Sequence, residues 1–242
     1  MKTPKTLSIV IPVYNEEKFI EKTIEEVIKA DSLGLKKEIV VIDDGSTDST
    51  PLILKKIKDK SVKNNLTLIL KKKNEGKGAA LKDGFKNTSG DIVLVQDADL
   101  EYNPDDYPSL LKPFISGQAD VVYGSRLVTA APHRVLYFWH YVINKSLTTI
   151  SNMLTNLNLT DMETGFKVFR GDIIRKIAPK LESKRFGFEP EITARISKVS
   201  EIKIYEVGIS YSGRTYKEGK KITWKDGIKA LFEIIKYNLF TS

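Results

Sequence analysis

Three acidic residues stand at alternate positions near the end of the segment DIVLVQDADLE, residues 91–101. Asp97, Asp99 and Glu101 follow the apolar, β-branched run Ile92–Val95, whose length and composition predict a buried strand of a mainly parallel sheet. Ligands of such sheets bind beyond the carboxyl ends of the strands. Carboxylate oxygens there could hold Mg²⁺ or Mn²⁺, and such a cation could hold a diphosphate. The alternative interpretation is an exposed acidic loop.

Polar residues also follow the two predicted strands at residues 7–13 and 37–42. Residues 14–16, Tyr-Asn-Glu, provide a flat ring on which a base could stack and side chains that could cap the next helix. A capped turn and nothing more is the alternative for this segment. Asp43 and Asp44 close the second strand. Turn formation does not require two adjacent acids, so we consider them as acceptors for a base N–H or for ribose hydroxyls.

The segment NEGKG, residues 74–78, follows a third predicted strand at residues 67–70. Its spacing matches neither the P-loop nor the dinucleotide-binding fingerprint. Its glycines and Lys77 could still approach a phosphate or a sugar. The first turn of a helix is the alternative interpretation.

Apolar periodicity places helices between and after these strands. Amphipathic spacing predicts helices over residues 16–29, 50–60 and 77–87. This alternation predicts a parallel sheet covered by helices on both faces. From about Asp105 the pattern changes, and we expect short strands at residues 119–123, 166–169 and 203–209. The remaining expected elements are a long helix over residues 136–157, a basic loop over 213–221 and an amphipathic helix over 223–240.

The composition limits the class of partner and the compartment. Lys and Arg total 39 against 31 Asp and Glu, and the formal charge of +8 favours an anionic partner such as a phosphate ligand or an anionic membrane. No recognised nucleic-acid motif accompanies that charge, so nucleic acid is not an expected partner. The absence of cysteine excludes disulfides and thiolate metal sites, and we expect a cytoplasmic protein that could associate with the cytoplasmic membrane face. No secretory signal is visible, and no segment approaches the ~18 apolar residues that span a bilayer.

Taken together, the motifs IPVYNEE, IDDGSTD, NEGKGAA and DADLE resemble family 2 glycosyltransferases of the GT-A fold. The later segments GSR, DMETGFKVFR and RFGFEPEI resemble the branch that contains dolichyl-phosphate mannose synthase and other polyprenyl-phosphate glycosyltransferases. The resemblance covers nearly the whole chain and implies an α/β fold of the GT-A, Rossmann-like type: a mixed, mainly parallel sheet flanked by helices, with a C-terminal amphipathic helix. It implies a catalytic domain over residues 1–212, with a nucleotide-binding half over about 1–104 and an acceptor-side half over about 105–212. The basic loop and terminal helix would occupy residues 213–242.

The same resemblance implies the site residues. The nucleotide sugar would contact Pro12, Tyr14, Asn15, Glu16, Asp43, Asp44, Gly45, Lys77, Asp97 and Ala98. A divalent cation, Mg²⁺ or Mn²⁺, would be held by Asp97, Asp99 and Glu101, the last standing where the lipid-phosphate enzymes often have Gln. The acceptor phosphate would be held by Arg126, Arg134 and Arg214. The catalytic residues would be Asp99, Glu189, Arg126 and Arg214.

The implied reaction is metal-dependent transfer of a hexose, with inversion, from a GDP- or UDP-linked donor to a polyprenyl phosphate such as dolichyl or undecaprenyl phosphate. A saccharide or protein hydroxyl is the alternative acceptor, and it would need a carboxylate base, for which Glu189 and Glu191 are the candidates. A non-catalytic nucleotide-sugar-binding protein is a more remote alternative. Sugar-nucleotide synthesis would need a glycine-rich first loop, which residues 14–16 do not provide.

The terminal helix has an apolar face beside several lysines. The residues that share this face are Trp224, Ile228, Leu231, Phe232, Ile235 and Leu239. Such a face could lie in a membrane interface. The alternatives are packing on the domain itself or on another subunit of a homo-oligomer.

Overall fold

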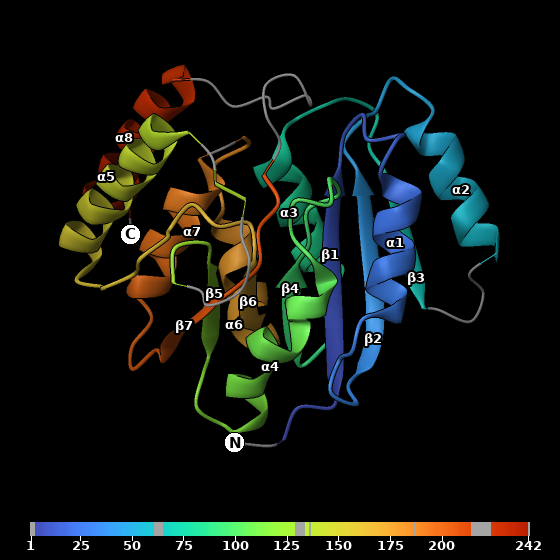
Figure 1. Cartoon of the computed structure of the whole chain (residues 1–242), viewed down its shortest axis with the longest axis horizontal. Helices are drawn as coiled ribbons and strands as arrows, with labels where there is room; N and C mark the ends of the chain where they lie inside the picture. Colours follow the sequence, from blue (N-terminus) through green and yellow to red (C-terminus); the bar gives the residue numbers. More distant parts are fainter. Residues whose placement is uncertain are drawn as a thin grey trace.

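The computed structural model describes residues 3–60, 65–128, 134–135, 137–185, 187–213 and 224–241. Within these residues, one sheet has the strand order β3-β2-β1-β4-β6-β5-β7 (Figure 1). The strands are β1 Thr6–Val13, β2 Lys36–Asp43, β3 Leu66–Leu70, β4 Ile92–Val95, β5 Val121–Ser125, β6 Lys167–Arg170 and β7 Ile204–Gly208. Only β6 is antiparallel to its neighbours β4 and β5 in this described sheet, so the predicted mixed, mainly parallel sheet is confirmed.

Helices cover both faces of the sheet because side chains alternate along the strands. On β1, Ile9 and Ile11 pack with α1 and α4, whereas Val10 packs on the other face with α3, α6 and α7. The helices are α1 Ile20–Lys29, α2 Thr50–Lys60, α3 Lys77–Lys86, α4 Tyr107–Ile115, α5 Phe138–Thr155, α6 Gly171–Ile177, α7 Phe188–Ser197 and α8 Trp224–Leu239. Short 3₁₀ turns at Pro104–Asp106 and Ala178–Lys180 adjoin α4 and α6.

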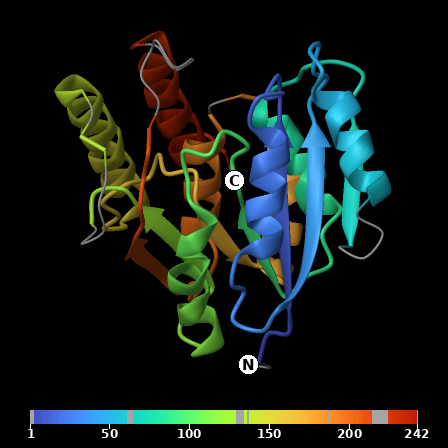
Figure 2. The ribbon, with the colours of Figure 1, turned by 45° about the vertical axis from the view of Figure 1, so that its right-hand side comes forward.

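Helices α5 and α8 form a separate pair at the end of the molecule remote from α1 and α2, as both views show (Figures 1 and 2). A small apolar cluster of Leu147, Met162, Ala230 and Ile234 joins them, and both helices contact α7. The terminal helix therefore packs on the domain through its Ala230 and Ile234 side. No helix in the described part of the chain combines the length and apolarity needed to cross a bilayer.

Several predicted boundaries move by one to four residues, among them those of the helix predicted over 136–157, which spans Phe138–Thr155, and three helices were not predicted. The helix predicted from residue 16 begins at Ile20, because Asn15 has a φ of +52° and the Glu16 carbonyl accepts the N–H groups of both Phe19 and Ile20 in a turn. The strand predicted at residues 119–123 lies at Val121–Ser125. Helices α4, α6 and α7 lacked a clear signal. In α7 the reason is physical: its residues from Phe188 to Ile196 are all buried, so no polar face gives it a helical period.

Candidate active site

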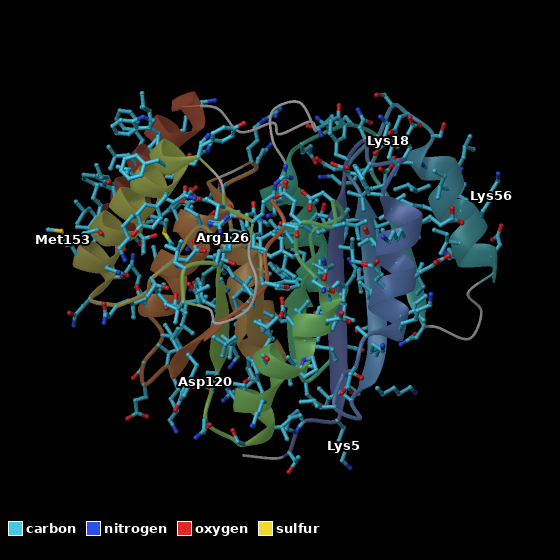
Figure 3. The ribbon with its side chains drawn as sticks, in the orientation of Figure 1. Lys5, Lys18, Lys56, Asp120, Arg126 and Met153 are labelled. Carbon is cyan, nitrogen blue, oxygen red and sulfur yellow. The ribbon has the colours of Figure 1, made fainter. Side chains whose placement is uncertain are left out.

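The predicted site residues that the structure describes lie toward one edge of the sheet, at strand ends, in the loops that follow them and in the first turns of α3 and α7. The carboxyl ends of β1, β2, β4, β5 and β7 point to this edge, together with the amino end of β6. Pro12 and Val13 end β1, and Asp43 ends β2 directly beside Val13. Arg126 follows β5 and lies near the middle of the molecule, whereas Asp120, just before β5, lies at the opposite edge (Figure 3).

The first two loops are tied to each other by hydrogen bonds. The Asn15 backbone N–H donates to Ser46 Oγ over 2.9 Å, and the Thr47 backbone N–H donates to Asn15 Oδ1 over 2.8 Å. The Glu16 backbone N–H donates to Thr50 Oγ1 over 3.1 Å. The structure thus gives Asn15 a joining function between the loops. Tyr14 is 37% exposed beside them, so its ring is accessible.

Asp43 and Asp44 are both buried but differ in what they bind. Asp44 accepts the backbone N–H groups of Glu75 and Gly76, the latter over 2.6 Å, and its Oδ1 lies 2.8 Å from Lys71 Nζ. Asp43 Oδ1 accepts the Ser46 backbone N–H over 3.3 Å. Burial raises the pKa of Asp43 above its ordinary value. Asp44 therefore fixes the NEGKG loop, and Asp43 has acceptor capacity for a ligand.

Glycines let the NEGKG loop approach its neighbours closely. Gly45 has a φ of +72°, and a Cβ there would lie 2.6 Å from the Lys73 carbonyl carbon. Gly76 has a φ of +101°, and a Cβ there would lie 2.2 Å from the Lys184 carbonyl oxygen. Only glycine adopts such backbone without strain at so close a contact. Gly45 is thereby explained as a packing residue.

Lys77 bridges two carboxylates from different parts of the chain. Its Nζ lies 3.0 Å from Asp97 Oδ1 and 3.1 Å from Glu189 Oε1. Burial lowers the pKa of Lys77, but the two carboxylates raise it more, so that it lies well above its ordinary value. The cation predicted to approach a substrate phosphate is therefore engaged with protein acids in this structure.

The DADLE loop leaves β4 through a strained turn. Leu100 has a φ of +59°, and Asp99 Oδ1 accepts the Glu101 backbone N–H over 3.2 Å. Glu101 Oε2 accepts the Tyr211 hydroxyl over 2.7 Å. Ala98 is buried, and its carbonyl accepts Thr23 Oγ1 over 3.0 Å.

The predicted cation ligands are not gathered around one point. No group of three or more His, Cys, Asp or Glu side chains arranged for a metal occurs among the residues that the structure describes. Asp97 faces the Lys77 ammonium, and Glu101 faces Tyr211. The ligand atoms nevertheless suit a hard divalent cation, because Asp97 and Asp99 provide carboxylate oxygens at the carboxyl edge of the sheet. The cation set remains a prediction.

The predicted phosphate-binding arginines have protein partners. The Arg126 guanidinium forks onto Asp161, with Nε–Oδ2 and Nη2–Oδ1 both at 2.7 Å, and stacks 5.2 Å from the centre of the Tyr211 ring. Arg134 donates from its backbone to the Tyr211 carbonyl and from Nη1 to the Gly213 carbonyl. Both arginines thus gather around Tyr211. Arg214 lies outside the described residues.

The two candidate bases on α7 have different surroundings. Glu191 is fully buried and accepts the backbone N–H groups of Glu182 and Ser183 and Nε of Arg195, at distances of 2.7–3.1 Å. Those bonds make Glu191 a structural residue. Glu189 is the one that reaches Lys77 and the Asp97 side of the site.

Sequence reasoning missed two buried ionisable residues, Glu163 just before β6 and Lys167 at its start. Lys167 donates from Nζ to the Met162 carbonyl over 2.9 Å, and burial lowers its pKa to about 8. Burial, and next the charge of Glu189, raise the pKa of Glu163 to about 7. The segment DMETGFK carried no period or known spacing that would separate these two residues from ordinary surface charges.

A mainly parallel sheet covered on both faces, with acidic loops at its carboxyl edge, defines an α/β protein of the GT-A class. Residues 8–178 match the model of Glycosyl transferase family 2, and the chain belongs to this family. The expected family and type of enzyme are thereby confirmed.

Named relatives lie in the branch that the sequence motifs suggested. The chain is 29% identical over 233 residues to a dolichol-phosphate mannosyltransferase from Pyrococcus furiosus, covering 96% of this chain and 64% of that protein. It is 26% identical over 244 residues to a UDP-N-acetylglucosamine–dolichyl-phosphate N-acetylglucosaminyltransferase from Methanococcus voltae, covering 96% of this chain and 95% of that protein. The chain therefore spans less than two thirds of the first relative and nearly all of the second.

A solved structure supports the fold. Glucosyl-3-phosphoglycerate synthase from Mycobacterium tuberculosis, in complex with Mn²⁺, uridine diphosphate and phosphoglyceric acid, matches with a TM-score of 0.70 and 18% identity. The match covers 97% of this chain and 79% of that chain. The predicted GT-A fold is confirmed.

Proposed function

We propose that this chain is a metal-dependent, inverting glycosyltransferase that moves a hexose from a GDP- or UDP-linked donor to a polyprenyl phosphate. The observation that carries the proposal is the Asp97–Lys77–Glu189 cluster, which joins the nucleotide-binding half to the acceptor-side half at the carboxyl edge of the sheet. Family membership and the two dolichyl-phosphate relatives support it.

The donor would bind across the ends of β1, β2 and β4. Asp43 offers a buried acceptor for a base N–H or a ribose hydroxyl, and Tyr14 offers a ring for stacking. Asp97 and Asp99 would hold a divalent cation, which would act as a Lewis acid on the leaving diphosphate. The Mycobacterium tuberculosis neighbour was solved with Mn²⁺ and uridine diphosphate, which supports this assignment.

The acceptor phosphate would bind on the Arg126 side. A phosphate monoester already carries an anionic nucleophile, because its second pKa is about 6. Its oxygen attacks the anomeric carbon on the face opposite the diphosphate, the bond to the diphosphate breaks, and the configuration inverts. Since Nε and Nη2 of Arg126 face Asp161, Nη1 is the donor that would meet the phosphate, together with Arg134 and Arg214.

A hydroxyl acceptor is the second candidate, and the position of Glu189 favours it. A hydroxyl must lose a proton during attack, and Glu189 is a carboxylate held within the cluster that includes Asp97. Turnover by Glu189→Gln would discriminate the two. A hydroxyl acceptor predicts a loss of about 100-fold or more, whereas a phosphate acceptor predicts a modest loss. Glu191→Gln is the matched control on the same helix, because Glu191 is a structural residue and its replacement should act through stability.

The α5–α8 pair offers a surface for contact with the membrane that holds a lipid acceptor. Both helices carry exposed apolar side chains: Phe138, Trp139, Tyr141, Ile143 and Met153 on α5, and Ile228, Phe232, Ile235 and Leu239 on α8. Met153 projects from the outer end of α5 (Figure 3). Exposed lysines accompany them, including Lys145, Lys229 and Lys236. Aromatic and aliphatic side chains beside lysines suit an anionic membrane interface, here at the cytoplasmic face.

A donor screen in the presence of lipid extract tests the proposal. GDP- and UDP-sugars carrying a radiolabelled hexose are incubated with the protein, Mn²⁺ and polyprenyl phosphates, and nucleotide release is measured. Label that moves into the organic phase supports the lipid-phosphate reaction. Nucleotide release only with soluble saccharides would favour the hydroxyl acceptor. Nucleotide binding without any release would favour a non-catalytic protein.

A further inference from the structure

The segment of residues 161–166, which leads into β6, is held firmly by its backbone. The Asp161 N–H donates to Glu206 Oε1 over 3.1 Å, and the Met162 N–H donates to Thr148 Oγ1 over 3.1 Å. The Gly165 N–H donates to the Tyr102 hydroxyl over 2.7 Å. Lys167 Nζ donates to the carbonyls of Met162 and Thr164. The side chains of this segment are therefore carried on a fixed frame.

Two adjacent side chains on this frame have buried oxygens with no hydrogen-bond partner. These atoms are Glu163 Oε1 and Thr164 Oγ1, and Thr164 is 0% exposed. Folded proteins pair the large majority of buried polar atoms, so an unpaired one requires an explanation. Two of them side by side on a rigid segment indicate a site that a ligand completes.

The two oxygens belong to the same cluster as the proposed donor and acceptor residues. Gly165, the next residue, packs so closely on Asp97 that a Cβ there would lie 2.4 Å from Asp97 Oδ2. The charges of Glu189, Lys167, Arg126 and Asp161 all act on Glu163. The unpaired oxygens therefore lie on the Asp97 side of the site, beside the residues proposed to hold the cation and the acceptor phosphate.

We propose that Glu163 and Thr164 form the subsite that binds hydroxyl groups of the transferred hexose. A sugar hydroxyl can donate to the Glu163 carboxylate, and another can donate to or accept from the Thr164 hydroxyl. The phosphates of donor and acceptor are anionic and provide mainly acceptors, so a carboxylate would repel them. This inference rests on the proposed function and deepens it, since it names residues that select which hexose is transferred.

Comparison of binding with and without the sugar tests the subsite. The variants are Glu163→Gln and Thr164→Val, which keep the shape of each side chain, with the exposed Glu25→Gln as control. GDP and UDP binding is measured by calorimetry with Mn²⁺, and kcat/KM is measured for GDP-mannose, UDP-glucose, UDP-N-acetylglucosamine and deoxy analogues of the best donor. Melting temperatures verify that each variant folds. If Thr164→Val does not fold, the Glu163→Gln variant alone is enough for the test.

The expected result is unchanged binding of the nucleoside diphosphate, within about twofold, and a fall in kcat/KM of about 10-fold or more for the best donor. One deoxy donor should show no further loss in the Glu163→Gln protein, because the contact is already absent. Equal weakening of GDP or UDP and of the sugar nucleotide would overturn the proposal in favour of a cation or nucleotide site. So would equal kcat/KM in wild type and both variants. If the wild type binds neither GDP nor UDP, the proposed function itself fails.

Discussion

The ammonium of Lys77 lies 3.1 Å from the carboxylate of Glu189, and this ion pair joins the amino end of α3 to the first turn of α7. The same ammonium lies 3.0 Å from Asp97, beyond the end of β4. Side-chain exposures of 21%, 7% and 18% for Lys77, Glu189 and Asp97 keep water from screening the cluster fully. Lys77 therefore holds an acid that follows β4 and an acid of α7 on either side of one ammonium group.

Replacement of Lys77 by Met should leave two carboxylates close together without a counter-charge. We expect a loss of folding free energy on the order of 3 kcal/mol, because breaking a buried pair strands the remaining charges. Activity should fall with it, and Lys77→Arg should recover part of both. Urea unfolding and turnover measure the effects, with the exposed Lys72→Met as control. Wild-type stability in Lys77→Met would contradict the bridging function.

Asp43 and Asp44 should respond oppositely to the same substitution. Asp44→Asn removes the ion pair with Lys71 and weakens the bonds to Glu75 and Gly76, so we expect a loss of about 1–3 kcal/mol in stability. Asp43→Asn should leave stability unchanged or raised, because burial disfavours its charged form. It should weaken nucleoside diphosphate binding about 10-fold, measured by calorimetry. The reverse pattern would exchange the functions assigned to the two residues.

Removal of divalent cations should abolish transfer. EDTA should remove activity, and Mn²⁺ or Mg²⁺ should restore it. Asp99→Asn should raise the Mn²⁺ concentration needed for half-maximal rate by about 10-fold or more, because a ligand charge is lost. The exposed Asp59→Asn should behave as wild type. Full activity in EDTA would remove the cation from the proposed reaction.

Charge introduced on the outer side of α8 should weaken membrane binding. Phe232, 69% exposed, is replaced by Asp, and Leu52 on α2, 62% exposed, is replaced by Asp as control. Co-sedimentation with vesicles containing about one third anionic lipid should fall about 10-fold or more for Phe232→Asp alone. Analytical ultracentrifugation tests the competing explanation, which is that this surface forms a dimer. If the wild type is a dimer that Phe232→Asp dissociates, this surface joins two copies of the chain.

Ionisation of Glu163 should cost stability in a defined pH range. Its pKa is about 7 in the folded protein against an ordinary value of 4.5, raised first by burial and then by Glu189, and lowered in part by Lys167 and Arg126. Between these values the folded state holds a proton that the unfolded state has released, so stability falls as pH rises from 4.5 to 7. Lys167, whose pKa burial lowers to about 8, keeps most of its positive charge over this range.

Glu163→Gln should therefore melt at the temperature of the wild type near pH 4.5 and a few degrees higher at pH 7.5. Each kcal/mol of stability shifts the melting temperature of a chain of this size by about 2–4 °C. Calorimetry across this pH range measures the difference, with Glu25→Gln as the flat control. A difference that does not change with pH would show that Glu163 keeps its charge throughout.

Local patterns in the sequence determined the strands and the acidic loops that follow them. The apolar runs of β1, β2 and β4 place Asp43 and residues 97–101 at strand ends without knowledge of any contact. Parallel strands have their carboxyl ends at one edge, so the meeting of these loops also follows from the sequence. Ile9 and Ile11 pack on one face of the sheet and Val10 on the other, an alternation that follows from the two-residue period of a strand.

Tertiary structure decided which of neighbouring acids is structural and which is available. Asp43 differs from Asp44, and Glu189 from Glu191, only in what distant segments bring to them: the backbone of residues 75–76 and 182–183, and the ammonium of Lys77. The unpaired oxygens of Glu163 and Thr164 likewise depend on neighbours far along the chain. Sequence periodicity reports burial of a face, whereas hydrogen-bond partners and electric fields depend on distances that only the folded chain sets.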